Sequence, residues 1–424
     1  MIIRNEEQEK PICLCNKKSV TLFIVIILLI VFSVIMIKGN ELSSKNLKWE
    51  WVIEPNLYKD IDYEGEGIFK AYGVDRNIYM IDINNNKLYK YPLFDDIYLD
   101  RENIFIASQN NKYFYINISG ERILDEAFDG LFKQREGISA VCKGNLWGFI
   151  DKDFNKIIDY QFNKVHSFSE GYAAVMNKEL KWGFIDKSGK LIMDFQYDEV
   201  KDFKNDLVAV RTENKWSFID RNGNIISKSF YDELGEFYEG FAAVKSHGKW
   251  GYIGTQGKEI INCIYDEAKD FSDGLAAVKV NNYFGDDNDA WAYIDTYGKE
   301  IIPFHQYSAI GGTSLVIGDF HDDKAFVTND LISVIDKKGK YVLFGGNTNF
   351  FISQPVYYKD YSAIIGYVYA DSAMKIKKYG LLNLNGKELL TPVFDYIRGI
   401  EGKYMIVENL TEGNFRCGVV RLKK

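Results

Sequence analysis

The chain has 424 residues, of which 46% are hydrophobic and 26% charged, and its formal net charge is −8 at pH 7. The first 38 residues hold five basic and three acidic side chains, so the remainder of the chain holds about −10. This balance disfavours nucleic acid as a partner, because phosphate binding requires clustered lysine and arginine.

Near the N-terminus, residues 19–37 form an almost uninterrupted apolar run between Lys17-Lys18 and Lys38. About 20 apolar residues in a helix span the roughly 30 Å core of a bilayer, so the run predicts a single-pass transmembrane signal-anchor helix. No Ala-x-Ala pattern follows the run, although a cleaved signal peptide remains the alternative. Basic residues are more numerous before the helix than after it. We therefore expect a cytoplasmic tail at 1–18, a linker at 38–48 and an extracytoplasmic domain at 49–424 in the cell membrane.

A phrase of ten residues dominates the rest of the chain. It reads KWGFIDKSGK at 181–190 and returns in four variants, whose tryptophans are Trp147, Trp216, Trp250 and Trp291. From Trp147 to Trp250, successive tryptophans are 34 or 35 residues apart. A fixed period of this length predicts a repeat architecture.

Each repeat contains three short segments with the pattern of β-strands. In the copy at 240–271, residues 241–245 and 249–253 read as strands, and 259–262 begin a third. An Asp-x-x-Gly sequence between the second and third segments, as at 186–189, predicts a tight turn. The sequence therefore predicts an all-β fold of tandem three-stranded meanders.

The tryptophans could present rings to a ligand, but their regular spacing favours a packing role in the core or between repeats. Ser217 and Ala292 replace the glycine that follows Trp in other copies, so small size rather than positive φ is the shared property. We expect that this small residue allows close packing against a neighbouring unit. The structural repeat positions are Trp147, Gly148, Trp182, Gly183, Trp216, Trp250, Gly251 and Trp291.

Less regular copies extend the array to about ten, with second strands near Ile78, Tyr113, Ile332, Tyr379 and Cys417. The segment at 51–58 resembles a third strand, and the segment at 417–422 is a second strand that lacks a third. The two ends together would complete one unit. Such an exchange of strands removes exposed sheet edges and favours a propeller-like ring, with an open β-repeat superhelix as the alternative.

The core KWGFID, with Gly-x-Ala-Ala-Val before it and Ile-Ile and Tyr-Asp after it, resembles the WG-containing (KWG) repeats of bacterial proteins. The resemblance covers about residues 51–424 and is densest at 137–302. It implies an all-β repeat without an established enzymatic activity, and it supplies no catalytic residues.

Catalytic motifs are not found in the sequence. The four histidines lie at unrelated positions of the repeat, and the chain has no nucleophile elbow, phosphate-binding loop or zinc-binding helix motif. Cys142, Cys263 and Cys417 are predicted to be small core residues rather than a disulfide framework. We expect no enzyme activity, no metal and no cofactor, and a glycan-active enzyme with two carboxylates is the remaining alternative.

Insertions that interrupt the repeat are better candidates for a binding site. Those at 281–289, 367–377 and 408–415 fall between the first and second strands of their units and should share one rim. The first combines aromatic and acidic residues but lacks the spacing of a calcium loop. We predict a binding loop formed by Tyr283, Phe284, Asp286, Asp287 and Asp289, with a solvated insertion as the alternative.

Two functions of different classes follow. The first is a membrane-anchored, extracytoplasmic binding module for an unknown protein or cell-envelope polymer. The second is a purely structural scaffold of an envelope complex, which depends on the anchor and has no ligand of its own.

Overall fold

The computed structural model describes residues 47–92, 94–227, 230–283, 289–304, 316–329, 331–343, 351–358, 361–370, 376–411 and 414–423. The predicted cytoplasmic tail, the transmembrane helix and the linker up to residue 46 lie outside this set. Within these ranges every element is a β-strand, as the sequence predicts, and no helix could cross a bilayer.

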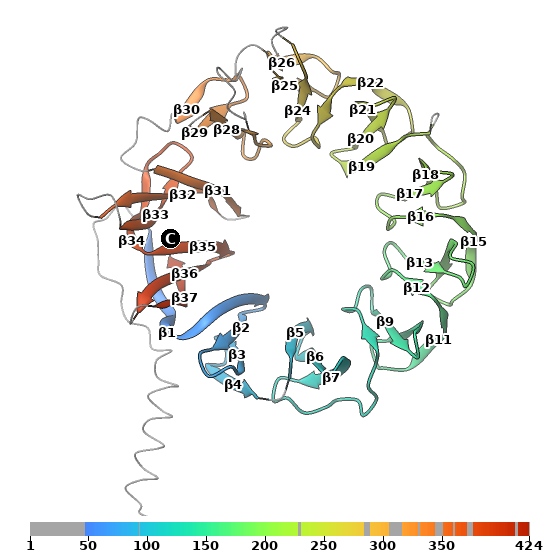
Figure 1. Ribbon diagram of the computed structural model, residues 1–424, viewed down its shortest axis with the longest axis horizontal. Coiled ribbons are helices and arrows are strands. Elements are labelled where there is room, and N and C mark those ends of the chain that lie inside the picture. The colour runs from blue at the N-terminus through green and yellow to red at the C-terminus, as the bar shows by residue number, and fades with distance from the viewer. Residues whose placement is uncertain are drawn as a thin grey trace, which may run out of the picture.

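The strands form nine antiparallel sheets in the described part of the chain, and one of these sheets has seven strands. The seven-stranded sheet consists of two repeat units joined edge to edge, so the fold has ten units. Figure 1 shows these units following one another around a ring, with the blue N-terminal strands beside the red C-terminal strands. We call the strands of a unit A to D, from the innermost to the outermost, and number the units 1 to 10 along the chain.

The A strands of units 1 to 10 are residues 58–65 of β1 (Lys48–Gly65), β5 (Asp96–Arg101), β8 (Gly130–Leu131), β12 (Lys164–Val165), β16 (Glu199–Val200), β19 (Glu233–Tyr238), β23 (Glu267–Ala268), β27 (Val316–Ile317), β31 (Phe351–Tyr358) and β35 (Tyr396–Glu401). The B strands are β2 (Ile68–Gly73), β6 (Ile104–Gln109), β9 (Ile138–Lys143), β13 (Tyr172–Met176), β17 (Leu207–Thr212), β20 (Phe241–Ser246), β24 (Leu275–Val280), β28 (Lys324–Asn329), β32 (Tyr361–Tyr369) and β36 (Tyr404–Thr411). The C strands are β3 (Ile78–Asp82), β7 (Lys112–Asn117), β10 (Leu146–Asp151), β14 (Trp182–Asp186), β18 (Lys215–Asp220), β21 (Lys249–Gly254), β25 (Ala290–Asp295), β29 (Leu331–Asp336), β33 (Lys377–Asn383) and β37 (Asn414–Lys423). The D strands are β4 (Lys87–Tyr91), β11 (Lys156–Phe162), β15 (Leu191–Tyr197), β22 (Glu259–Tyr265), β26 (Glu300–Ile302), β30 (Tyr341–Leu343), β34 (Glu388–Phe394) and, in unit 10, residues 48–53 of β1.

The ten C strands coincide with the ten copies that the sequence predicts. The prediction of three strands per unit is wrong, because most sheets contain a fourth, innermost strand. In units 3, 4, 5, 7 and 8 this A strand has only two residues, as in β16. Two residues are too few to show the alternation by which a strand is recognised in a sequence.

Strand β1 joins the two ends of the chain. Its residues 48–53 pair with β37, with Lys48 opposite Lys423 and Ile53 opposite Val419, and its residues 58–65 pair with β2. Glu50 is buried in this junction and forms an ion pair with Lys423, in which Oε2 lies 2.6 Å from Nζ. The predicted exchange of strands between the chain ends is therefore present, and it favours the ring over an open superhelix.

Neighbouring units pack through apolar side chains. Ten buried clusters are found in the described residues, and each draws its members from two adjacent units. Between units 4 and 5, the buried ring of Phe203 lies 5.3 Å from that of Phe184. Burial of one such side chain contributes about 2 kcal/mol. Between units 9 and 10, Trp49 and Trp51 pack edge-on against Phe394, so the junction made by β1 is also apolar.

The Asp-x-x-Gly sequences form the predicted C–D turns. The Asp186 carboxylate accepts the backbone N–H groups of Ser188 and Lys190 at 2.9 and 3.0 Å. Gly189 has a φ of 83°, and a Cβ there would lie 3.2 Å from Ile158 of the preceding unit. The glycine thus serves both the turn and the contact between units.

The glycine after Trp packs within its own unit, so the expected contact with a neighbouring unit is wrong. A Cβ on Gly183 would lie 2.6 Å from the carbonyl oxygen of Met193 in the D strand, and one on Gly251 would lie 2.4 Å from that of Ile261. Neither glycine has a positive φ, as the Ser and Ala replacements predict. Units 3, 4, 6 and 9, which carry this glycine, have seven-residue D strands with register shifts. Where Ser217 and Ala292 replace it, the D strand is unassigned or only three residues long.

The tryptophans have the predicted packing role. Trp182 and Trp291 are buried in clusters between units, while Trp147, Trp216 and Trp250 lie half-buried against such clusters. Cys142, Cys263 and Cys417 are free thiols in the described part of the chain. Cys142 and Cys417 are buried, as predicted for small core residues, whereas Cys263 is half-buried.

Candidate functional site

The ring has two rims. We call one the Tyr-Asp rim, because it carries the B–C turns and the D–A connections with their Tyr-Asp pairs. There the ammonium of Lys249 lies 2.6 Å from Oδ1 of Asp266, whose Oδ2 accepts the N–H of Asn281 at 2.9 Å. The same pairing of lysine and aspartate joins Lys112 to Asp129, Lys181 to Asp198, Lys215 to Asp232 and Lys378 to Asp395. The lysine of the repeated phrase therefore fixes the start of the next unit.

The opposite rim, which we call the Glu-Gly rim, carries the A–B and C–D turns. Here the Glu170 carboxylate accepts the N–H groups of Asn205 and Asp206 in the next unit, at 2.7 and 2.8 Å. Glu239 makes the equivalent contacts to Asp273 and Gly274. Each of these two turns is thus tied to the turn of the following unit.

The described chain enters the ring on the Glu-Gly rim. Lys48 pairs with Lys423, and the N–H of Leu422 donates to the carbonyl of Lys403 in the A–B turn of unit 10. Any segment that precedes Lys48 therefore attaches to this rim.

The three insertions share the Tyr-Asp rim, as the sequence predicts, because each connects a B strand to a C strand. They belong to units 7, 9 and 10, on one side of the ring (Figure 1). Each carries apolar side chains that are about half exposed, and we call the set Tyr283, Ile376, Leu410 and Phe415 the insertion sector. Their exposures are 47%, 51%, 57% and 55%.

Of the predicted binding loop, only Tyr283 and Asp289 belong to the described residues. The ring of Tyr283 stacks on that of Phe304 at 4.9 Å, and Asp289 pairs with Lys279 at 2.8 Å. Phe284, Asp286 and Asp287 lie outside the described residues, so the loop remains a prediction.

Polar side chains on the A strands and directly after them line the inner face of the ring and connect neighbouring units. Nδ1 of His166 in unit 4 lies 2.7 Å from Oδ1 of Asp202 in unit 5, and Lys204 in unit 5 lies 3.0 Å from Glu236 in unit 6. Glu236 belongs to the A strand β19, whereas the other three residues follow β12 or β16 within four residues. The sequence interpretation missed them because it did not identify the A strands.

A cavity of about 500 Å³ opens beside the A strands of units 4, 5 and 6, and Arg135 of unit 3 also lines it. Its polar lining includes the His166–Asp202 and Lys204–Glu236 pairs together with Arg135 and Lys201. Its apolar lining includes Phe203, Leu207, Phe218 and Phe237, all of which are buried. A cavity of this size with convergent polar groups has the character of a binding pocket for a small group.

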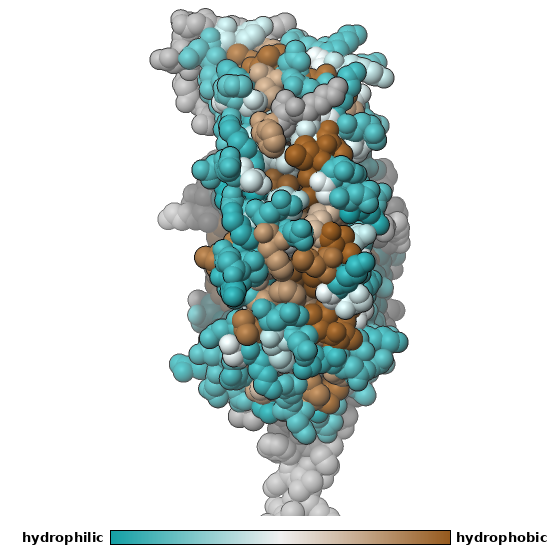
Figure 2. Space-filling model, turned by 90° about the vertical axis from the view of Figure 1, so that its right-hand side faces the viewer, coloured by the Kyte–Doolittle hydropathy of each residue, from teal (hydrophilic) through white to brown (hydrophobic). Residues whose placement is uncertain are grey.

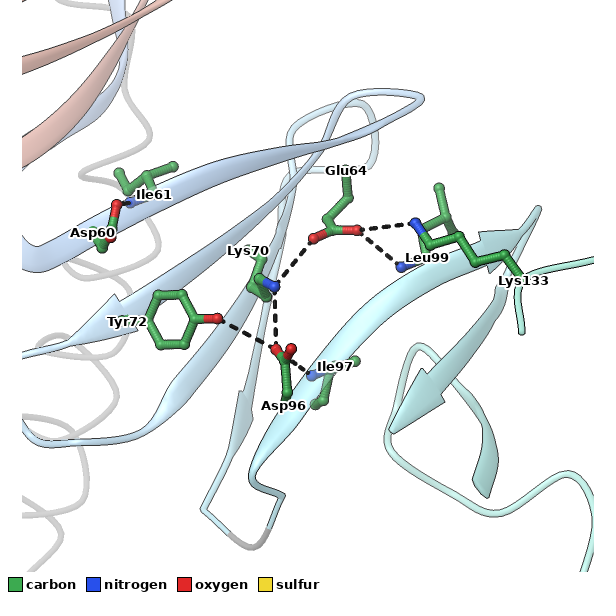
Figure 3. A network of polar contacts seen from close by, with 9 residues as sticks. All are labelled: Asp60, Ile61, Glu64, Lys70, Tyr72, Asp96, Ile97, Leu99 and Lys133. Carbon is green, nitrogen blue, oxygen red and sulfur yellow. Dashed lines mark hydrogen bonds and ion pairs between the residues drawn. The ribbon is translucent and has the colours of Figure 1, made fainter. Parts of the chain in front are cut away.

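A buried ionic network connects units 1 and 2, as Figure 3 shows. Lys70 occupies a B-strand position that holds alanine in units 3 to 7, and its side chain is 9% exposed. Its ammonium lies 3.4 Å from Glu64 and 3.1 Å from Asp96. Burial alone would lower the pKa of Lys70, but its contacts with Tyr72, Asp96 and Glu64 prevail and raise it. Lys70 is therefore a charged link between units.

The outer face of the ring is partly apolar. Figure 2 shows brown surface running around the side that lies on the right in Figure 1. The exposed apolar side chains of the D strands and their turns in this part of the ring include Ile157, Leu191, Ile225 and Ile260. Each of these side chains lies at the end of a C–D turn. The apolar outer surface is therefore a property of the repeat rather than of one unit.

No group of three or more His, Cys, Asp and Glu residues is arranged to hold a metal ion in the described part of the chain.

Comparison with known families identifies the repeat. A family model described as "WG containing repeat" matches residues 147–180, 182–216, 216–250, 250–284, 291–330 and 379–409. These segments include most residues of the C strands of units 3 to 7 and of unit 9, but they do not reach β29, the C strand of unit 8, or β37, the C strand of unit 10. No curated protein matches the sequence.

Solved structures resemble the chain only distantly. One titled "Crystal structure of the eukaryotic initiation factor" has 10% sequence identity and a TM-score of 0.42, over 74% of this chain and 91% of that one. BamB from Moraxella catarrhalis also has 10% identity, with a TM-score of 0.30 over 57% of this chain and 95% of that one. Similarity at this level carries no information about function.

Proposed function

We propose that this chain, which carries WG-containing repeats between residues 147 and 409, is a membrane-anchored, extracytoplasmic binding module for a protein or cell-envelope polymer. The module is a propeller-like ring of ten units, and the partner contacts its insertion sector. The observation that carries the proposal is the half-exposed apolar set Tyr283, Ile376, Leu410 and Phe415, which lies on insertions of a single rim. Apolar side chains gathered on loops over a rigid scaffold are typical of interaction surfaces.

The position of Lys48 supports the same function. A membrane anchor before Lys48 would attach to the Glu-Gly rim, and the insertion sector lies on the opposite rim. The sector would then face away from the bilayer, where a protein or polymer of the envelope can reach it.

Capture from an envelope extract tests the proposal. The full-length chain in detergent serves as bait, beside a Leu410→Ser/Phe415→Ser variant and a Leu180→Ser variant. Leu180 is 62% exposed on the same rim but belongs to the regular unit 4, so it controls for lost apolar surface. We expect a partner that is retained by the chain and by the Leu180 variant and lost with the double variant. Equal retention by all three would refute the insertion sector as the contact.

The structural scaffold remains the second candidate function. It is favoured if the role of the chain depends on the sequence of the anchor helix. Exchange of residues 19–37 for an unrelated transmembrane helix should leave a binding module functional and inactivate a scaffold that acts through its anchor. The glycan-active enzyme ranks last, and turnover of a glycoside that a single carboxylate substitution abolishes would establish it.

A further inference from the structure

The cavity on the inner face of units 4 to 6 is separate from the insertion sector, which belongs to units 7, 9 and 10. We propose that this cavity is a second binding site, which receives a carboxylate of an acidic peptide segment beside an apolar side chain. Arg135 and Lys201 bind the carboxylate, and the buried side chains of the floor contact the apolar neighbour.

Arg135 and Lys201 are the cations that a ligand can neutralise. Arg135 is exposed and lies within 4.0 Å of no carboxylate among the described residues. The ammonium of Lys201 donates to the carbonyl of Leu234 at 3.3 Å and lies 5.9 Å from the ring of Trp216, and it also has no carboxylate partner in the described chain. Both cations line the cavity of a protein whose overall charge is −8. They favour an anionic group at this place.

The remaining charges around the cavity lie in two ion pairs, apart from Asp270, whose carboxylate interacts electrostatically with Lys201 and Lys204. His166 faces Asp202, and Lys204 faces Glu236. Asp270 approaches from unit 7, where its Oδ1 would lie 3.4 Å from a Cβ on Gly235. Because three carboxylates surround the site, a singly charged carboxylate meets less repulsion than a doubly charged phosphate.

The apolar side chains on the floor of the cavity favour a peptide over a glycan as the ligand. Phe203, Phe218 and Leu207 are buried, and the ring of Phe237 lies 4.8 Å from that of Phe218. Because these rings are almost wholly buried, they offer little open aromatic surface on which a sugar ring could stack. An apolar side chain of a peptide matches this floor.

The test uses the full-length chain in detergent and N-acetylphenylalanine as the probe, with N-acetylphenylalaninamide as its uncharged match. Binding is followed by ligand-observed NMR. A probe of this size should bind with a dissociation constant on the order of 1 mM, and the amide should bind at least about tenfold more weakly. The Arg135→Gln variant should lose at least about fivefold in affinity, and Arg135→Gln/Lys201→Met at least about tenfold. The control variant Lys178→Met should lose none, because the Lys178 side chain is 86% exposed on the Tyr-Asp rim.

Since Arg135 is exposed, its variant tests the site even if the Lys201 substitution disturbs folding. Equal binding of the acid and the amide, or unchanged binding to both Arg135 variants, would overturn the proposal. Tighter binding of phenyl phosphate or of glucuronic acid would overturn the choice of a peptide carboxylate. Loss of partner capture through the insertion sector would leave this result unaffected, because the probe does not depend on that sector.

Discussion

The ammonium of Lys249 lies 2.6 Å from Oδ1 of Asp266, seventeen residues later in the chain. This spacing recurs in four further units, in which the lysine lies at or next to the start of the C strand and the aspartate ends the D–A connection. The pair explains why the repeated phrase begins with lysine and closes with Tyr-Asp. The motif is thus a structural device of the rim.

Substitution of this lysine should destabilise the ring at neutral pH and less so in acid. Burial alone would raise the pKa of Asp266, but the hydrogen bonds from Lys249 and the N–H of Asn281 prevail and lower it below the ordinary value of 3.8. A carboxylate with a lowered pKa stabilises the fold above about pH 4 and loses this contribution as the pH falls through its folded pKa. Lys249→Met should therefore cost about 1 kcal/mol at pH 7 and less at pH 3, measured by thermal unfolding. An equal loss at both pH values would contradict the role of the pair.

Addition of a methyl group after Trp250 should disrupt the outer strand of unit 6. In Gly251→Ala the new Cβ would lie 2.4 Å from the carbonyl oxygen of Ile261, so the D strand must move. We expect a loss of about 2 kcal/mol, whereas Ala292→Gly should cost about 0.5–1 kcal/mol because unit 7 already accommodates a Cβ. Urea unfolding followed by tryptophan fluorescence measures both. Similar losses for the two variants would show that the glycine has no special contact.

Substitution of Lys70, whose ammonium is buried between units 1 and 2, should strongly destabilise the fold. Lys70→Met keeps the volume but leaves Glu64, whose side chain is 9% exposed, with only the longer contact of 4.0 Å to Lys133 as an ion pair. The expected loss is about 3 kcal/mol, and a second substitution, Glu64→Leu, should recover a large part of it. The double-mutant cycle in thermal unfolding measures the coupling. Additive losses would contradict a network.

The two ends of the chain should be close enough to cross-link. Glu50 lies opposite Arg421 in the pairing of β1 with β37. Under mild oxidation, Glu50→Cys/Arg421→Cys should form an intramolecular disulfide, identified by peptide mapping. The control pair Glu50→Cys/Lys178→Cys joins opposite rims and should not form one. Failure of the first pair to cross-link would indicate an open array.

The sequence was informative where features repeat and uninformative where they are short. The repeated phrase and the landmarks of its less regular copies located all ten C strands, and the strand-like segments at 51–58 and 417–422 predicted the joining of the ends. The A strands escaped recognition because elements such as β16, with two residues, have no periodicity of their own. The inner-face cavity escaped for the same reason. Its pairs His166–Asp202 and Lys204–Glu236 are separated by 36 and 32 residues, a spacing that follows the repeat and could have identified them.

The sequence predicted on which rim the insertion sector lies, but not which of its apolar side chains are exposed. The loop lengths indicated a shared rim, and the structure bears this out for units 7, 9 and 10. The half-exposed state of Leu410 and Phe415 depends on how β36 and β37 extend beyond the neighbouring units, which a pattern of residues does not specify.

Photo-crosslinking in native membranes tests the proposed function most directly. A benzophenone amino acid replaces Phe415 in one full-length chain and Leu180 in another, so that the same probe samples the insertion sector and the regular part of the same rim. The account predicts a specific higher-mass adduct from position 415 and none from position 180. Equal adducts from both positions, or none from position 415, would contradict binding through the insertion sector.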